Sequence, residues 1–256
     1  MIDLKDRVVL LTGASSGIGA ATAPVLGAAG AHVVAHHLGD GDRAGAERAL
    51  ADVPPDRKLL LAADFADLQA IDALWASALA WRGRVDAIVL NAAITRMQAE
   101  DDDDATWLEA WDSQWRVNVL GPARLMRAAV PSFRRQGGGV FITMASWNAQ
   151  RGSTNPAQIA YAASKAAIKA AAQTLARGYA RDGILSYVIS PGIVRTKMSE
   201  DFAALQGGEA KVTATLAMGE WVPPAELGRL IAFLATGKVR HLSGATLDVN
   251  GATYVR

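Results

Sequence analysis

The stretch Val8-Val-Leu-Leu-Thr-Gly-Ala-Ser-Ser-Gly-Ile-Gly19 carries the strongest structural signal in the sequence. An unbroken apolar run, Val8–Leu11, passes directly into a turn with three glycines, and an alanine-rich segment typical of a helix follows. Gly13 permits a sharp turn, Gly17 lets a pyrophosphate approach backbone N–H groups, and Gly19 lets the helix pack close to the strand. Glycines at such a turn can be purely structural, but strand, turn and helix stand here in the order that a dinucleotide site requires.

Short apolar runs alternate with longer helical segments along the chain. Continuous Val, Ile and Leu, rather than alternation with polar residues, indicate strands covered on both faces. We expect strands at Val8–Leu11, His32–His36, Lys58–Ala62, Ala87–Leu90, Val140–Met144, Leu185–Ile189 and Ala245–Val249. We expect helices at Gly17–Ala29, Arg43–Ala51, Leu68–Trp81, Trp107–Arg134, Tyr161–Tyr179 and Pro224–Ala235. This order predicts a single-domain α/β Rossmann fold over residues 1–256, a doubly wound parallel sheet of about seven strands with helices on both faces.

Composition excludes several classes of function. The 256 residues carry 26 basic and 25 acidic side chains, a formal charge of +1, which gives no sign of a nucleic-acid surface. Cysteine is absent and the four histidines form no metal-ligand pattern, so no metal is expected. No apolar run approaches the roughly 20 residues that span a bilayer, and the first residues are not typical of a signal peptide. We therefore expect a cytoplasmic protein.

Two stretches stand outside the alternation of strands and helices. Asp101–Asp104 is a run of four aspartates that we interpret as a solvated loop before a helix, rather than a metal site. Residues 197–222 are interrupted by glycines and carry several large apolar side chains. Because this excursion follows the sixth strand, where ligands bind in such sheets, we interpret it as a substrate lid, with mere decoration as the alternative.

The motifs, taken in order, resemble the short-chain dehydrogenase/reductase family from Thr12 to about Gly251. The glycine spacing at the first turn matches, and Tyr161-Ala-Ala-Ser-Lys165 matches the family's Tyr-x-x-x-Lys. Asn91-Ala-Ala93 is similar to its Asn-Ala-Gly motif, with alanine in place of the glycine. The resemblance implies an NAD(P)-dependent oxidoreductase that interconverts a secondary alcohol and a ketone, or a sugar hemiacetal and a lactone, by hydride transfer.

Tyr161 and Lys165 are expected to form the chemical centre. Four residues apart on a helix, they share one face. A phenol has a pKa of about 10, and a neighbouring ammonium favours the phenolate, so we expect Lys165 to depress the pKa of Tyr161 and make it a general acid/base. Without the glycine turn upstream, a core tyrosine beside a solvated lysine would be the simpler interpretation.

Two further catalytic residues are implied by the resemblance. Ser146 is similar to the family's serine that hydrogen-bonds the substrate oxygen, although its distance from Tyr161 is slightly longer than usual, and Ser153 and Thr154 remain rivals. Asn118 is expected to kink its helix and to hold a water in a proton relay through Lys165. A polar helix residue facing solvent is the competing interpretation.

The cofactor is expected to be NADP or NAD, with NADP preferred. The acid that usually grips the ribose near the end of the second strand is missing, while His36, His37 and Arg43 could meet a 2′-phosphate. His37 could equally cap its strand. The residues expected at the cofactor are Gly13, Ser15, Ser16, Gly17, Ile18, Gly19, His36, His37, Asp64, Phe65, Asn91, Ala92, Ala93, Tyr161, Lys165, Pro191, Gly192, Ile193 and Thr196.

The substrate is expected to be a sugar or polyol, bound by Ser146, Trp147, Gln150, Arg151 and Tyr161, with Thr95 and the lid nearby. A 3-oxoacyl thioester reductase is the main alternative, and a non-catalytic dinucleotide-binding regulator or a scaffold protein are the alternatives from other classes. Family members are commonly tetramers, so the resemblance implies a homotetramer that acts on a small molecule and binds neither nucleic acid nor membrane.

Overall fold

The computed structural model describes residues 2–256 and contains a sheet of seven parallel strands in the order β3-β2-β1-β4-β5-β6-β7. The strands are β1 (Val8–Leu11), β2 (His32–His37), β3 (Lys58–Ala62), β4 (Ala87–Leu90), β5 (Gly139–Met144), β6 (Ile184–Pro191) and β7 (Thr246–Val249). The strand order reverses between β1 and β4. In open parallel sheets the crevice beyond the carboxyl ends at such a reversal is where ligands bind.

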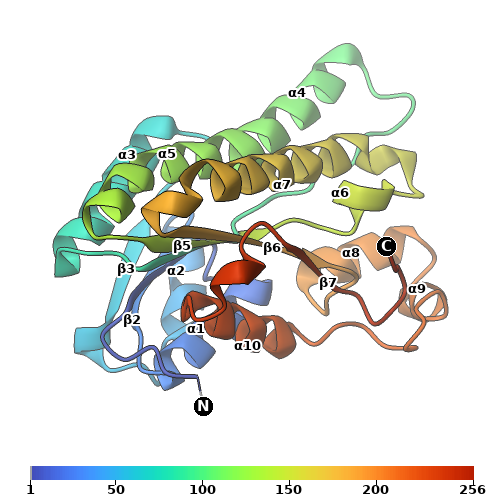
Figure 1. Ribbon diagram of the computed structural model, residues 1–256. Coiled ribbons are helices and arrows are strands. Elements are labelled where there is room, and N and C mark those ends of the chain that lie inside the picture. Colours follow the sequence, from blue (N-terminus) through green and yellow to red (C-terminus); the bar gives the residue numbers. More distant parts are fainter. Residues whose placement is uncertain (1) are drawn as a thin grey trace.

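Helices cover both faces of the sheet, as the sequence predicts. Figure 1 shows α3, α4, α5 and α7 above the sheet and α1, α2 and α10 below it. The longer helices are α1 (Gly17–Ala28), α2 (Asp40–Ala49), α3 (Leu68–Arg82), α4 (Asp104–Trp115), α5 (Gly121–Arg135), α7 (Ile159–Tyr179) and α10 (Pro224–Ala235). The confirmed fold class follows from the strand patterning, because strands apolar on every position need cover on two sides.

The two faces form separate apolar cores. Successive side chains of a strand point to opposite faces. In β1, Val9 and Leu11 therefore join a buried cluster with Leu26 of α1 and Ile231 of α10. The remaining β1 side chains, Val8 and Leu10, join the cluster on the α3, α5 and α7 side. Packing on both faces fixes β1 rigidly, and with it the start of the glycine turn.

The predicted helix Trp107–Arg134 is not continuous. It begins earlier, at Asp104, because the carboxylate of Asp103 caps the helix by accepting from Thr106 N at 2.7 Å. It is then interrupted by a π-helical turn, Arg116–Leu120, before α5 continues. The aspartate run thus lies at a turn and a helix start, and no group of acidic or histidine side chains suited to a metal occurs among residues 2–256.

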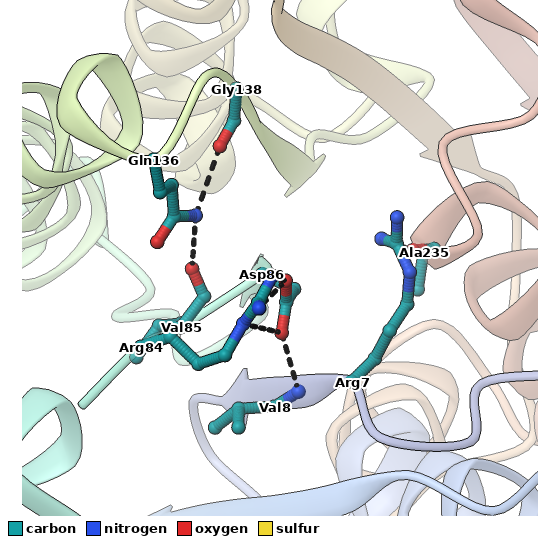
Figure 2. A network of polar contacts seen from close by, with 8 residues as sticks. All are labelled: Arg7, Val8, Arg84, Val85, Asp86, Gln136, Gly138 and Ala235. Atoms are coloured by element: carbon teal, nitrogen blue, oxygen red, sulfur yellow. Dashed lines mark hydrogen bonds and ion pairs between the residues drawn. The ribbon is translucent and has the colours of Figure 1, made fainter. Parts of the chain in front are cut away.

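Polar side chains tie the amino ends of the strands together (Figure 2). Asp86, buried just before β4, accepts from Val8 N at 2.8 Å and pairs with Arg84. Arg7 donates to Ala235 O, at the end of α10, at 2.8 Å. Gln136 donates to Val85 O at 2.8 Å. These polar groups are hydrogen-bonded to one another, so the amino end of the sheet has a structural role. The carboxyl end is the one left for ligands.

Residues 197–222 fold into a small unit over the end of the sheet. It contains α8 (Lys197–Leu205) and α9 (Glu209–Thr213), and α6 (Asn148–Arg151) lies near them in Figure 1. Trp221, Val212 and Ala203 pack with Trp147 in a third apolar cluster. None of the three short helices was predicted. Within the described residues, no helix has both the length and the apolar character needed to traverse a bilayer.

Candidate active site

The glycine turn is as crowded as its sequence predicts. Gly13 and Gly17 have φ of 68° and 53°, the left-handed region that favours glycine. A Cβ on Gly19 would lie 1.9 Å from Gly13 O and 2.8 Å from Asn91 Nδ2. Only glycine at this position lets α1 start against the turn, so the backbone N–H groups at the helix start stay open to a ligand.

Thr12 and Asn91 hold the turn against the end of β4. The Thr12 hydroxyl donates to Val89 O at 3.0 Å and accepts from the backbone N–H groups of Asn91 and Ala92 at 2.9 and 3.0 Å. The Asn91 amide donates to Thr12 O at 2.9 Å and to Gly13 O at 3.1 Å. Asn91 therefore shapes the cofactor turn as well as lining the cavity beside it.

His36 is a neutral part of the same framework. Its Nδ1 accepts from Gly13 N at 3.0 Å, so its Nε2 carries the proton and donates to Ala63 O at 2.8 Å. Burial lowers the pKa of His36 from 6.5 to about 4, because the charged ring would lose its hydration. His36 thus presents no positive charge near neutral pH.

A cavity of about 530 Å³ runs from the glycine turn to Tyr161. The predicted cofactor residues that line it are Gly13, Ser15, Ser16, Gly17, Ile18, His36, Asp64, Phe65, Asn91, Ala92, Ala93, Tyr161, Lys165, Pro191, Gly192 and Thr196. Gly19 does not line the cavity but packs against Gly13 O and Asn91, and Ile193 lines a second cavity instead. The prediction that His37 lies at the cofactor cavity is not met. His37 is buried and is not among the residues that line the cavity, and its Nδ1 pairs with Gly39 O at 3.0 Å.

Leu38, Asp42 and Arg96 also line this cavity and were not predicted to do so. Leu38 lies two residues past the strand end predicted at His36, and Asp42 lies in the first turn of α2. The carboxyl-end rule for parallel strands could have found Leu38, because β2 ends one residue before it.

Tyr161 and Lys165 meet at the deep end of the cavity. The Lys165 ammonium lies 5.9 Å from the centre of the Tyr161 ring and donates to Met144 O at 3.0 Å. Burial raises the pKa of Tyr161 to about 12, with the neighbouring Ser146 hydroxyl opposing the rise, and burial lowers the pKa of Lys165 to about 8. The pKa of Tyr161 is thus shifted in the opposite direction to the depression expected from Lys165, because burial is the largest influence on the phenol.

A second cavity, of about 410 Å³, opens on the other side of Tyr161. It shares Ser146, Tyr161 and Gly192 with the first, and Trp147, Arg151 and Thr95 line it as predicted. Gln150 does not line it, which corrects the prediction. Its amide turns away to donate to Ser190 Oγ at 2.9 Å and to Asp248 Oδ1 at 2.6 Å.

Ser146 is better placed than its rivals. It is 7% exposed and borders both cavities, whereas Ser153 and Thr154 line only the second. The Ser153 hydroxyl is also engaged, donating to Gln158 Oε1 at 2.8 Å. Ser146 accepts from Asn148 N at 3.2 Å, which leaves its proton free for another acceptor.

Asn118 lies within the π-helical turn and is 2% exposed, so a solvent-facing role is wrong. Its Oδ1 accepts from Ile94 N at 2.9 Å, and its Nδ2 donates to Ile94 O at 2.9 Å and to Ser164 Oγ at 3.1 Å. With its amide satisfied by protein, Asn118 holds the chain after β4 in place. The expected distortion of the helix is present, and the water relay stays a prediction.

Comparison with known proteins places this geometry among reductases and dehydrogenases. A family model described as enoyl-(acyl carrier protein) reductase matches residues 13–252. The 3-oxoacyl-[acyl-carrier-protein] reductase FabG of Escherichia coli K12 is 30% identical over 258 residues, covering 99% of this chain and 100% of that protein.

Two solved structures have the same architecture. A putative short-chain alcohol dehydrogenase from Sinorhizobium meliloti 1021 aligns with a TM-score of 0.89 at 26% identity, covering 98% of each chain. A putative NAD(P)-dependent gluconate 5-dehydrogenase from Beutenbergia cavernae, with bound NADP, aligns with a TM-score of 0.88 at 30% identity, again over 98% of each chain.

Proposed function

Because the chain belongs to the short-chain dehydrogenase/reductase family and is an oxidoreductase, we propose that it interconverts a secondary alcohol and a ketone with Tyr161 as the general acid/base. One observation carries the proposal: Ser146 and Tyr161 border both cavities, and Lys165 lies one helical turn from Tyr161. A dinucleotide in the first cavity and a substrate in the second would meet at these hydroxyls.

The first cavity fits a nicotinamide dinucleotide. At one end lies the glycine turn, where the lack of a Cβ on Gly19 lets α1 begin close to the turn and leaves backbone N–H groups for a phosphate. The other end of the cavity reaches Tyr161. The turn residues Ser15, Ser16 and Gly17 would hold the pyrophosphate, and Pro191 and Thr196 would hold the nicotinamide end. When bound, the cofactor supplies the hydride chemistry.

The protein supplies a proton and a positive charge. Tyr161, whose pKa is raised by burial, keeps its proton near neutrality and can donate it to a carbonyl oxygen within reach. Ser146 would donate to the same oxygen, where negative charge develops. The ammonium of Lys165 would stabilise the phenolate left behind, and the same groups run in reverse for oxidation of an alcohol.

We propose a sugar or polyol as the substrate, with a 3-oxoacyl thioester as the alternative. The second cavity supports the first, because hydroxyl and amide groups of Thr95, Asn148 and Gln206 line it beside the apolar Trp147 and Phe202. We also propose that residues 197–222 act as its lid. The similarity to FabG, a 3-oxoacyl-[acyl-carrier-protein] reductase, supports the alternative of a 3-oxoacyl thioester.

The test is a substrate panel read by nicotinamide absorbance. Protein is mixed with NADH or NADPH and either ketoses, small ketones or 3-oxoacyl thioesters. Loss of absorbance with a ketone supports the proposal, and activity confined to acyl thioesters supports the alternative. Tight cofactor binding with no turnover of any carbonyl would support a regulator.

We propose NAD as the preferred cofactor, in place of the NADP preference expected from the sequence. None of the expected cations brings a positive charge to the cavity. His36 lines it but is neutral, whereas His37 and Arg43 lie outside the lining, His37 being buried and Arg43 paired with Glu47 at 2.9 Å. Asp42 does line the cavity, and an acid there favours ribose hydroxyls over a 2′-phosphate. The NADP bound to the Beutenbergia protein supports the opposite preference, so a variant test is needed.

Leu38→Arg is expected to shift the preference to NADP. Leu38 lines the cavity and is 58% exposed, so an arginine fits there and can pair with a 2′-phosphate. We expect kcat/KM to favour NAD at least about tenfold in the parent, and kcat/KM with NADP to rise about tenfold or more in the variant. Leu38→Gln, of similar length without charge, is the control. A parent that favours NADP tenfold would contradict this assignment.

We also propose a cytoplasmic homotetramer. Trp107, Leu108 and Trp115 of α4 are exposed apolar side chains near Leu120, more than an isolated helix surface needs. A monomer in sizing chromatography would contradict the assembly.

A further inference from the structure

The second cavity is electrostatically one-sided. Of its lining residues among 2–256, none is acidic, whereas Arg151 and Lys211 are basic. The first cavity differs, because Asp42 and Asp64 are among its lining residues together with basic ones such as Arg96. A substrate entering the second cavity therefore meets positive charge without a neighbouring carboxylate to neutralise it.

Neither cation has an acidic partner in the described residues. Two cations close to Lys211 in the sequence do have such partners: Arg195 pairs with Glu209 at 2.9 Å, and Lys197 pairs with Asp201. Among residues 2–256, Arg151 and Lys211 take part in no ion pair and donate no side-chain hydrogen bond to protein. Their donors remain available to a ligand.

Both cations are anchored on one apolar support. The Arg151 guanidinium lies 4.6 Å from the centre of the Trp147 ring, and Trp147 is 8% exposed. Trp147 packs in the same cluster as Val212, the residue next to Lys211 in α9. The Lys211 side chain extends along Gly207, where a Cβ would lie 3.0 Å from its Cδ. Both residues are exposed to solvent where they line the cavity, and stacking and packing limit where their side chains lie.

We propose that the substrate carries an anionic group, a carboxylate or a phosphate, which Arg151 and Lys211 bind while Ser146 and Tyr161 hold the reacting oxygen. This rests on the proposed function and narrows its substrate class to small hydroxy or keto acids, or phosphorylated polyols. An arginine fork pairs with either anion, and a cavity of about 410 Å³ suits a molecule of this size. A neutral sugar would offer neither cation a charge to pair with.

The test compares matched anionic and neutral probes on the parent and on Arg151→Gln/Lys211→Gln. The probes are gluconate, glucitol 6-phosphate and neutral glucitol, with the corresponding keto compounds in the reductive direction. We expect kcat/KM for the favoured anion to exceed that for the neutral probe at least about 30-fold, and to fall about 30-fold or more in the double variant. It should also fall with added salt, while the neutral probe should not respond.

The matched control is Arg229→Gln/Lys238→Gln, which removes the same charge from exposed positions outside both cavities. Arg151→Lys/Lys211→Arg keeps both charges and should recover most of the activity if charge, rather than packing on Trp147, is what matters. Comparing kcat/KM for gluconate with that for glucitol 6-phosphate shows whether the bound anionic group is a carboxylate or a phosphate.

The outcomes separate the substrate class from the reaction. Turnover of neutral ketones at parent rates in the double variant, with no preference for anions, overturns this inference and leaves the oxidoreductase assignment intact. If no probe is turned over, calorimetric binding of gluconate and glucitol 6-phosphate decides. Anion binding that is lost in the double variant supports the inference even without turnover. Absent or unchanged binding overturns the inference, while the carbonyl panel described above decides the proposed function separately.

Discussion

Replacing Tyr161 with phenylalanine is expected to lower kcat/KM about 10²–10⁴-fold, the range that a positioned general acid contributes. The ring stays in its slot on α7, so packing is kept and only the hydroxyl next to Ser146 is lost. The phenol hydroxyl is expected to transfer a proton rather than to hold the cofactor. The dissociation constant for the dinucleotide should therefore change less than about threefold. Both constants are measured with the best substrate of the panel and by quenching of tryptophan fluorescence.

Tyr179→Phe is the matched control, because it makes the same chemical change at the far end of the same helix. Its kcat/KM should equal the parent's. A Tyr161→Phe enzyme that turned over at near-parental rate would assign the proton transfer to another group, of which Ser146 is the nearest hydroxyl bordering both cavities.

The sequence predicts the sheet well and the residues over it poorly. The bounds of β1, β3 and β4 match the predicted runs. The fully buried β1 and β4 are apolar at every position, and β3, at the edge of the sheet, is apolar after Lys58. The helices α6, α8 and α9 were missed, since short helices interrupted by glycines carry no clear period. Their positions depend on packing around Trp147, which spacing alone cannot reveal.

Site residues divide along the same line. Gly13, Ser146, Tyr161 and Lys165 were predicted at the site, and all four line the first cavity, because their spacing and the strand ends fix where they lie. Gln150 was misplaced because the direction of a side chain on a four-residue helix is set by partners distant in sequence, here Ser190 and Asp248. The neutral state of His36 was likewise hidden, since it depends on burial and on the N–H of Gly13 that donates to its Nδ1.

Gly19→Ala is expected to weaken dinucleotide binding by about 10²-fold or more and to destabilise the fold by about 1–3 kcal/mol. The added methyl would lie 1.9 Å from Gly13 O, far inside contact distance, and 2.8 Å from Asn91 Nδ2. Neither neighbour yields easily, because Asn91 Nδ2 donates to Thr12 O and Gly13 O and the N–H of Gly13 donates to His36. The turn must therefore move, and the N–H groups that would face a pyrophosphate move with it.

Gly178→Ala separates this local effect from a general cost of replacing glycine. Gly178 lies in α7 with no atom within 4 Å of a built Cβ, so alanine there should stabilise the helix by up to about 1 kcal/mol and leave cofactor affinity unchanged. Dissociation constants from fluorescence titration and unfolding free energies from urea melts test both variants. If Gly19→Ala bound the cofactor with the parent's affinity, the turn would be able to relax around a methyl group. The close packing of α1 against β1 would then not be what keeps the N–H groups of the turn available.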